Sequence, residues 1–301
     1  MDIITQNIPI KHSSVKLFIK REDLIHPLIS GNKYRKLKYN LVQAKVESHH
    51  TLLTFGGAFS NHILAVASAG FENNLKTIGI IRGEELFSKI NENPTLKKAQ
   101  GLGMSFKFIS REAYKEKNNP EFIRNLRNEF GTFYLIPEGG TNDLAIKGCE
   151  EIITNDEFQY DYICSSVGTA GTITGIINAS LSHQKIIGFP ALKGSFISKE
   201  ISNFANKMNW EIESDYHFGG YGKISDALIR FINEFFLKYN IPLDPIYTGK
   251  MMYGIFDLID KNYFPKNSKV LAIHTGGLQG INGMNELLKK QQKEIIITHE
   301  N

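Results

Sequence analysis

The sequence SGNKYRKLKYNL occupies residues 30–41 and predicts the start of a helix, because it opens with turn and cap residues and continues without Pro or Gly. At about 100° per residue, one face of this helix carries Lys33, Leu37, Leu41 and Ala44. Pointing away from that face are Arg35, Lys36 and Lys38. Lysine is seldom buried without a partner, so a lysine at the head of an apolar stripe is unusual.

Two interpretations of Lys33 are open on this segment alone. In the first, the ammonium bends out to solvent, as long side chains do readily. In the second, the side chain lies in a dry pocket, where desolvation lowers its pKa and makes the amine a nucleophile toward an aldehyde. The rest of the chain bears on the choice.

The composition is typical of a soluble globular protein. The 301 residues carry a net charge of +4, and 42% are hydrophobic, which suits one large or two modest domains. The charges are scattered, which argues against nucleic-acid binding. Cys149 and Cys164 lack metal-ligand spacing and fit a reducing cytoplasm. We expect a cytoplasmic protein with no metal site, no signal peptide and no membrane span.

Short apolar runs rich in β-branched and aromatic residues alternate with helical patterns. The predicted strands are 15–19, 51–55, 77–81, 105–109, 132–136, 160–165, 185–189, 211–216 and 269–274. The predicted helices include 60–69, 93–102, 121–130, 143–153, 225–238 and 249–261. This alternation predicts an α/β protein with parallel sheets covered on both faces. Such folds bind ligands at the carboxyl ends of their strands.

Glycine-rich segments follow several predicted strands, at residues 56–62, 167–175, 218–222 and 275–280. Residues 168–172, GTAGT, precede a helix and therefore indicate an anion site suited to a phosphate. The segment is neither a Walker A loop nor the dinucleotide fingerprint. It has no lysine or arginine, so backbone N–H groups and hydroxyls are the expected donors. A plain strand-to-helix turn is the alternative.

Two further segments precede predicted helices. Ser60 is a good N-cap residue, and the same hydroxyl can hold a substrate carboxylate. His62 taken alone is more often structural than catalytic. Residues 244–250, DPIYTGK, read as a turn leading into a helix. Each of these has a purely structural interpretation.

A phosphate site and a helix-face lysine are the minimum requirement for pyridoxal 5′-phosphate, whose aldehyde is held as a lysine Schiff base. Here the chain resembles the 1-aminocyclopropane-1-carboxylate deaminase/D-cysteine desulfhydrase family, of the tryptophan-synthase-β-like fold. The resemblance runs over nearly the whole chain and is most specific at residues 20–23, 30–37, 57–62 and 244–250.

This resemblance implies pyridoxal-phosphate fold type II, with two parallel-sheet domains. The large cofactor-binding domain would comprise residues 1–48 and 151–301, and the small mobile domain residues 49–150. The resemblance also implies a homodimer.

The resemblance gives roles to the matching residues. The expected catalytic residues are Lys33, Ser60, Tyr221 and Tyr247, of which Lys33 forms the Schiff base and Tyr247 stacks by the cofactor ring. The cofactor phosphate would be held by Val167, Gly168, Thr169, Ala170, Gly171 and Thr172. The substrate would contact Ser60, Asn61 and His62, and Asn61 would also bond the 3′ oxygen of the cofactor.

Thr248 matches the position that faces the pyridine nitrogen, where cyclopropane deaminases of this family have glutamate. A threonine hydroxyl leaves the ring nitrogen neutral and the ring a weaker electron sink. We therefore expect α,β-elimination on a small amino acid, D-cysteine or similar, giving a keto acid, ammonia and sulfide. The alternatives are a cyclopropane deaminase, an amino-acid racemase, a cofactor-binding protein without turnover, and a nucleotide-binding protein.

Overall fold

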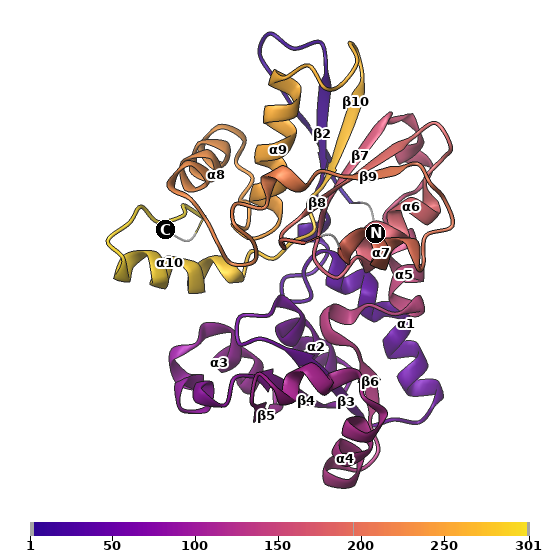
Figure 1. Ribbon diagram of the computed structural model, residues 1–301, viewed down its shortest axis with the longest axis vertical. Coiled ribbons are helices and arrows are strands. Elements are labelled where there is room, and N and C mark those ends of the chain that lie inside the picture. Colours follow the sequence, from indigo (N-terminus) through magenta and orange to yellow (C-terminus); the bar gives the residue numbers. More distant parts are fainter. Residues whose placement is uncertain (1–2, 195, 300–301) are drawn as a thin grey trace.

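The computed structural model describes residues 3–194 and 196–299, which form two β-sheets with helices on both faces (Figure 1). The strands are β1 Thr5–Ile8, β2 Lys16–Lys20, β3 Thr51–Gly56, β4 Lys76–Arg82, β5 Met104–Ile109, β6 Tyr134–Ile136, β7 Tyr162–Val167, β8 Lys185–Pro190, β9 Trp210–Ile212 and β10 Lys269–Ile273. The α-helices are α1 Asn32–Val46, α2 Asn61–Glu72, α3 Pro94–Gly101, α4 Pro120–Phe130, α5 Asp143–Glu150, α6 Gly171–Ala179, α7 Phe196–Ser202, α8 Asp226–Tyr239, α9 Thr248–Asp260 and α10 Gly280–Lys290. Short 3₁₀ helices cover Glu22–Leu24, Glu84–Glu92, Ala113–Asn118, Glu138–Gly140, Asn155–Gln159 and Ser214–Tyr216.

The two sheets differ in the part of the chain that builds them. The larger has the order β1-β2-β10-β7-β8-β9, and the smaller has the order β5-β4-β3-β6. All pairings are parallel except that of β1 with β2. The predicted α/β class with parallel sheets is confirmed. The small sheet lies in the lower half of Figure 1 and the large sheet in the upper half.

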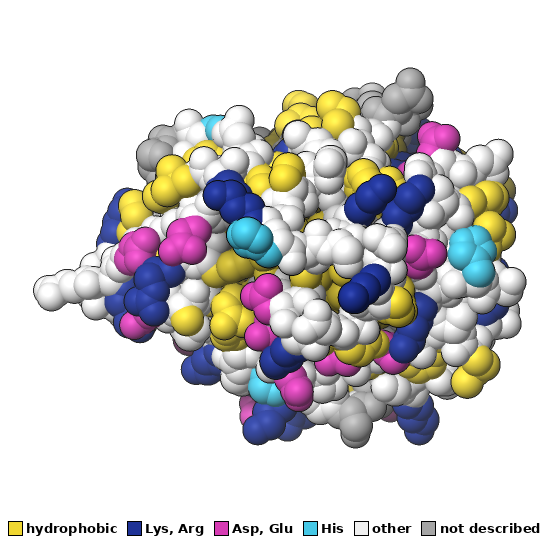
Figure 2. Space-filling model, turned by 90° about the horizontal axis from the view of Figure 1, so that it is seen from above, with side chains coloured by type: hydrophobic (Ala, Val, Ile, Leu, Met, Phe, Trp, Pro, Cys, Tyr) yellow, Lys and Arg dark blue, Asp and Glu magenta, His cyan; other side chains and the backbone are white. Residues whose placement is uncertain are grey.

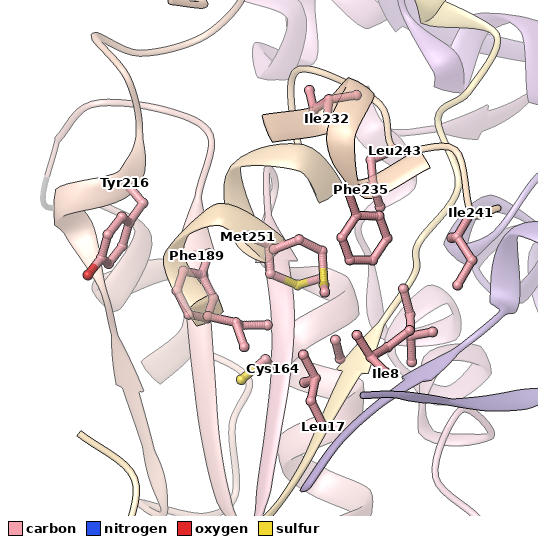
Figure 3. Packing of buried hydrophobic residues seen from close by; sticks show 14 of the residues in the cluster. Ile8, Leu17, Cys164, Phe189, Tyr216, Ile232, Phe235, Ile241, Leu243 and Met251 are labelled. Carbon is pink, nitrogen blue, oxygen red and sulfur yellow. The ribbon is translucent and has the colours of Figure 1, made fainter. Parts of the chain in front are cut away.

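The large sheet packs against α8 and α9 through an apolar core (Figure 3). On α8, Leu228, Ile232 and Phe235 recur at helical spacing and are buried, so one stripe of the helix faces the sheet. Met251 of α9 and Leu17 of β2 lie in the same cluster. Full burial of each such side chain stabilises the fold by about 1.5–3 kcal/mol.

The small sheet is buried on both faces, as its continuous apolar strands require. Small residues of α2 such as Ala65 and Ala69 let that helix lie close to one face. On the other face, Phe55 and Phe133 pack with Leu126 of α4. Its strands all lie between residues 51 and 136, within the predicted small domain. The domain boundaries themselves remain a prediction.

The junction between the sheets is formed by α1 and α5. At Gly148 of α5 an added Cβ would lie 2.0 Å from the Arg35 carbonyl oxygen, so only glycine allows this approach of the two helices. On the face seen in Figure 2, basic and acidic side chains are interspersed.

Over residues 3–194 and 196–299, the chain forms no helix with the length and apolar character needed to cross a bilayer.

Candidate active site

A cavity of about 340 Å³ lies between the two sheets. Its walls come from the start of α1, the loop before α2, the loop between β7 and α6, and the segments that follow Asp244 and β10. The carboxyl ends of β3, β7 and β10 therefore open onto it, as expected for parallel strands.

The first turn of α1 is fixed against the end of β10. Gly31 has φ 61°, and a Cβ there would lie 1.9 Å from the Thr275 carbonyl oxygen. The Asn32 N–H donates to that same oxygen at 3.2 Å. From the other side, the Glu22 carboxylate pairs with Arg35 at 2.9 Å. These contacts hold the helix start so that Lys33 lines the cavity.

Lys33 has the character of a nucleophilic amine. Its Nζ donates to Asn32 Oδ1 at 3.1 Å and lies close to the Lys36 ammonium. Burial, and secondarily the repulsion from Lys36, lowers the pKa of Lys33 to about 7. Much of the amine is therefore neutral near pH 7, which supports the second interpretation of this lysine.

Lys36 lies in the cavity wall, and the prediction that it points away was wrong. Its side chain is 2% exposed. Its Nζ donates to the Gly139 carbonyl oxygen at 3.0 Å, to Thr141 Oγ1 at 3.0 Å and to Thr169 Oγ1 at 3.2 Å. Burial lowers its pKa to about 8. The position of Lys36 could have been predicted from the sequence, because residues i and i+3 of a helix are neighbours and Lys33 was expected on the buried face.

The segment predicted to hold a phosphate lies beside Lys36. β7 ends at Val167, and the backbone then turns through Gly168, Thr169 and left-handed Ala170 into the N-terminus of α6 at Gly171. The Thr172 hydroxyl accepts from Asn32 Nδ2 at 2.7 Å. The loop, the helix end and the Lys36 ammonium together form a positive, donor-rich corner of the cavity.

The small sheet contributes the residues at the start of α2. Ser60 Oγ accepts from the N–H groups of His62 and Ile63, so it is the N-cap of α2 and also lines the cavity. Asn61 Oδ1 is buried and makes no hydrogen bond within the described residues. His62 Nε2 lies 2.9 Å from Thr54 Oγ1, and burial with the nearby Lys33 and Lys36 holds the pKa of His62 well below its usual range. His62 is therefore neutral at pH 7.

Two tyrosines line the opposite wall. The rings of Tyr221 and Tyr247 are 6.3 Å apart, and Tyr247 lies against Gly168, where a Cβ would be 3.1 Å from the ring. Burial and then Tyr221 raise the pKa of Tyr247 well above its ordinary value, and burial also raises the pKa of Tyr221. Both hydroxyls therefore remain protonated near neutral pH.

Thr248 lies behind the cavity wall rather than in it. Its hydroxyl donates to Asp244 Oδ1 at 2.8 Å, and it is absent from the residues that line the cavity. The carboxylate of Asp244 also accepts from the N–H groups at the start of α9, which places it as that helix's cap. By contrast, Thr275 lines the cavity, with its hydroxyl 3.0 Å from Ser166 Oγ. The geometry thus does not favour the predicted contact of Thr248 with a cofactor ring.

Comparison with known proteins bears on this site. The family model described as pyridoxal-phosphate dependent enzyme matches residues 4–276. The chain belongs to this family of pyridoxal-phosphate-dependent enzymes.

Relatives of this pyridoxal-phosphate-dependent enzyme cover most of its length. A putative 1-aminocyclopropane-1-carboxylate deaminase of Pyrococcus horikoshii is 31% identical over 88% of this chain and 85% of its own. A bifunctional D-cysteine desulfhydrase/1-aminocyclopropane-1-carboxylate deaminase of Arabidopsis thaliana is 28% identical over 91% of this chain and 75% of its own. A solved structure described as an ACC deaminase homologue has a TM-score of 0.83 at 28% identity and covers 96% of this chain and 94% of its own. The predicted family and fold type II are confirmed.

The residues present fit pyridoxal phosphate. Lys33 offers an amine of low pKa for the aldehyde, and the corner around Lys36 offers a cation and hydroxyls for the phosphate. The ion pairs of the described residues give Lys36 no carboxylate partner, and a buried ammonium is costly without an anion. Asn61 Oδ1, which is buried and has no hydrogen-bond partner among the described residues, is a further group that a bound ligand could satisfy.

Proposed function

We propose that the protein catalyses α,β-elimination on a small amino acid, D-cysteine or a similar one. For cysteine the reaction consumes one water and gives pyruvate, ammonia and hydrogen sulfide. In this proposal Lys33 holds the cofactor, Asn61 bonds its 3′ oxygen, and the segment 167–172 with Lys36 holds its phosphate.

The observation that carries the proposal is that the Asp244 carboxylate in the cavity wall is already occupied by hydrogen bonds within the protein. Among the described residues that line the cavity, Asp244 is the acidic one, and its oxygens already accept from Ile246, Tyr247 and Thr248. A ring nitrogen in this site would therefore meet hydroxyls rather than a free carboxylate. We place Thr275 rather than Thr248 in that role. A neutral ring is a weak electron sink, which suits a reaction whose β-substituent leaves with the electron pair.

When bound, pyridoxal phosphate supplies the aldehyde that takes up the substrate amino group and a ring that delocalises the electron pair released at Cα. The N-terminus of α2 has its positive dipole end toward the cavity and holds the substrate carboxylate, with the Ser60 hydroxyl as a further donor. This contact orients the Cα–H bond toward Lys33.

In this proposal the Lys33 amine, which lines the cavity, would take the Cα proton of the substrate on Nζ. Its low pKa lets the amine be neutral and basic near pH 7. The Tyr221 hydroxyl, protonated at this pH, gives a proton to the departing sulfur, and Tyr247 holds Tyr221 in place. Acid–base assistance of this kind contributes about 10²–10⁴ in rate.

The proposal is tested by adding D-cysteine to the purified holoenzyme and measuring sulfide and pyruvate together. We expect the cofactor absorbance band to shift and the two products to appear in equal amounts. A holoenzyme whose cofactor band responds to D-cysteine but that releases neither product would contradict elimination.

Cyclopropane ring opening is the second candidate, because the similar proteins of the Pyrococcus and Arabidopsis species carry that activity in their names. It is distinguished by incubation with 1-aminocyclopropane-1-carboxylate and assay for ammonia and 2-oxobutyrate. We expect slower release than from D-cysteine, because the ring carbon lacks a leaving group that accepts the electron pair.

We further propose that the chain acts in the cytoplasm as a homodimer, with residues 49–150 moving as the small domain. The buried free thiols of Cys149 and Cys164 suit a reducing compartment. Sedimentation equilibrium of the holoenzyme tests the dimer, and a monomer at micromolar concentration would contradict it.

A further inference from the structure

The loop 217–222 carries Tyr221 to the cavity through an unusual backbone path. Phe218, Gly219, Gly220 and Gly222 all have positive φ, at 52°, 91°, 113° and 68°. For Phe218 this conformation is strained, and such strain persists only where the surroundings hold the backbone in place. The packing around the loop therefore has to include a specific anchor.

Lys250, in the first turns of α9, reaches back to this loop. Its Nζ donates to the His217 carbonyl oxygen at 2.8 Å and to the Gly220 carbonyl oxygen at 2.9 Å. These two carbonyls bracket the strained part of the loop. The side chain is 2% exposed, and the described residues give it no ion pair within salt-bridge distance.

Two neighbours of Lys250 on the same face of α9 contact the loop and the residue just before it. The ring of Phe218 meets the ring of Tyr253 edge-on at a centroid distance of 5.0 Å. At Gly254, an added Cβ would lie 2.8 Å from the Tyr216 ring, so the glycine allows Tyr216 to pack directly against the backbone of α9. Residues i, i+3 and i+4 of α9 thus form one docking face for the loop.

The helix that anchors the loop is also the helix that follows Tyr247. The α9 helix starts at Thr248, and the Asp244 carboxylate fixes its N-terminus. A loop tied to α9 therefore has Tyr221 placed relative to Tyr247 by one rigid element.

We propose that Lys250 is a positioning residue, whose ammonium ties the loop 217–222 to α9 and so sets Tyr221 against Tyr247 at the cavity. The inference rests on the proposed function, because it assigns to Tyr221 a place in the reaction.

The chemistry of the site explains why lysine stands there. Burial lowers the pKa of Lys250 to about 8, because keeping a charged ammonium away from water costs free energy in the folded protein. Methionine has a similar length and would fill the space without that cost. The ammonium adds two hydrogen bonds to carbonyl oxygens of the strained loop, which methionine cannot make.

The test compares Lys250→Met with a matched control in the holoenzyme. Lys207 also donates to two backbone carbonyls, those of Asn178 and Ser180, but none of these three residues lines the cavity. We expect Lys250→Met to retain the cofactor absorbance and to lose about 10- to 100-fold in kcat/KM, mostly in kcat, as a misplaced reacting group does. Lys207→Met should keep wild-type kcat, and Lys250→Arg, which retains the donors, should recover part of the loss.

A second measurement is independent of turnover. Lys223 lies directly after the loop, and its N–H donates to the Gly220 carbonyl oxygen. We expect trypsin to cleave after Lys223 at least tenfold faster in Lys250→Met than in the wild type or in Lys207→Met. If Lys250→Met does not fold, Lys250→Gln replaces it, since its amide is too short to reach both carbonyls.

Cleavage at the wild-type rate would overturn the inference. Full kcat/KM in a variant whose loop is cleaved faster would overturn it too, because the loop would then be released without effect on the reaction. A wild-type enzyme without elimination activity would instead contradict the proposed function, and the trypsin result would still decide whether Lys250 anchors the loop.

Discussion

Lys33 and Lys36 place two ammonium groups in one wall of the cavity, three residues apart on α1. Burial and then the nearby Lys36 bring the pKa of Lys33 to about 7, and burial brings the pKa of Lys36 to about 8. Lys36 meets neutral oxygens of Gly139, Thr141 and Thr169. In the proposed function, Lys33 forms the covalent bond to the cofactor and Lys36 contacts its phosphate.

Replacing Lys33 by Ala should abolish turnover and covalent capture of the cofactor while leaving the fold intact. The measurement is borohydride reduction of the holoenzyme followed by peptide mass spectrometry, which should find the label on Lys33. Lys45→Ala, at the exposed end of the same helix, is the control and should behave as the wild type. A label on another lysine, or wild-type turnover by Lys33→Ala, would contradict the assignment.

Capture of pyridoxal phosphate by the apoenzyme should become faster as the pH rises through about 7, because the neutral amine is the reactive form and the pKa of Lys33 is about 7. In Lys36→Met the midpoint should move upward, because a repulsive charge that lowers the pKa is gone. Stopped-flow absorbance across the pH range measures both. A wild-type midpoint near the ordinary lysine value of 10.5 would disagree with this account.

The candidate site was predictable where a residue's type and neighbours define its task. Lys33, Ser60 and Tyr247, to which the family resemblance gave roles in the site, all line the cavity. Thr275 and Asp244 were not identified, because their roles depend on which strand ends and helix starts meet in space. A hydroxyl at a strand end and a carboxylate before a helix are too common in sequence to single out.

At the scale of elements, the approach of α1 to the end of β10 depends on Gly31. An added Cβ would lie 1.9 Å from the Thr275 carbonyl oxygen, and φ is 61°. We expect Gly31→Ala to lower the free energy of unfolding by about 2 kcal/mol or more and to slow cofactor capture, because Lys33 shifts with the helix start.

Gly101→Ala is the matched control for that substitution. Gly101 lies in the last turn of α3, and an added Cβ there would have no neighbour within 4 Å. Its effect on the free energy of unfolding should lie between zero and a gain of about 1 kcal/mol. Urea titration of the apoenzymes measures both, and an equal stability of the two variants would refute the steric argument.

The sequence patterns located most elements but not all of them. The predicted strand 185–189 corresponds to β8, and its apolar run is long enough to be recognised. β1 was not predicted, because TQNI at residues 5–8 is mostly polar and pairs only as an edge strand beside β2. The predicted strand 211–216 ends early, at Ile212, and a 3₁₀ helix follows where the chain leaves the sheet edge.

At the scale of the whole molecule, α10 and the loop before α2 join the two parts of the structure. The ring of Phe59 lies against Gly283, where an added Cβ would be 2.9 Å from it. Phe59 directly precedes Ser60, so this contact sets how near the Ser60 hydroxyl comes to the large sheet. If the two sheets move together over a bound substrate, the contact between Phe59 and Gly283 would change during that movement.

Gly283→Val should therefore lower kcat/KM by about tenfold, mainly through a higher KM for the amino acid, with the cofactor absorbance unchanged. Phe59→Ala removes the obstructing ring, so the same Gly283→Val change made in that background should have little further effect. Steady-state kinetics of the two single variants and the double variant form the cycle. Additive losses would show that Phe59 and Gly283 do not act through their contact.

The order of strands in the large sheet has a consequence for how the protein folds during its synthesis on the ribosome. β10 lies between β2 and β7, so the first strands of this sheet have no partner on that side until residues 269–273 have been made. The small sheet is contiguous at residues 51–136 and is complete much earlier. Domains fold as units during synthesis. We therefore expect residues 51–136 to fold first and residues 5–46 to fold later. Because Gly31 and Asn32 dock on the Thr275 that follows β10, we expect Lys33 to reach its final place only after Thr275 has been made.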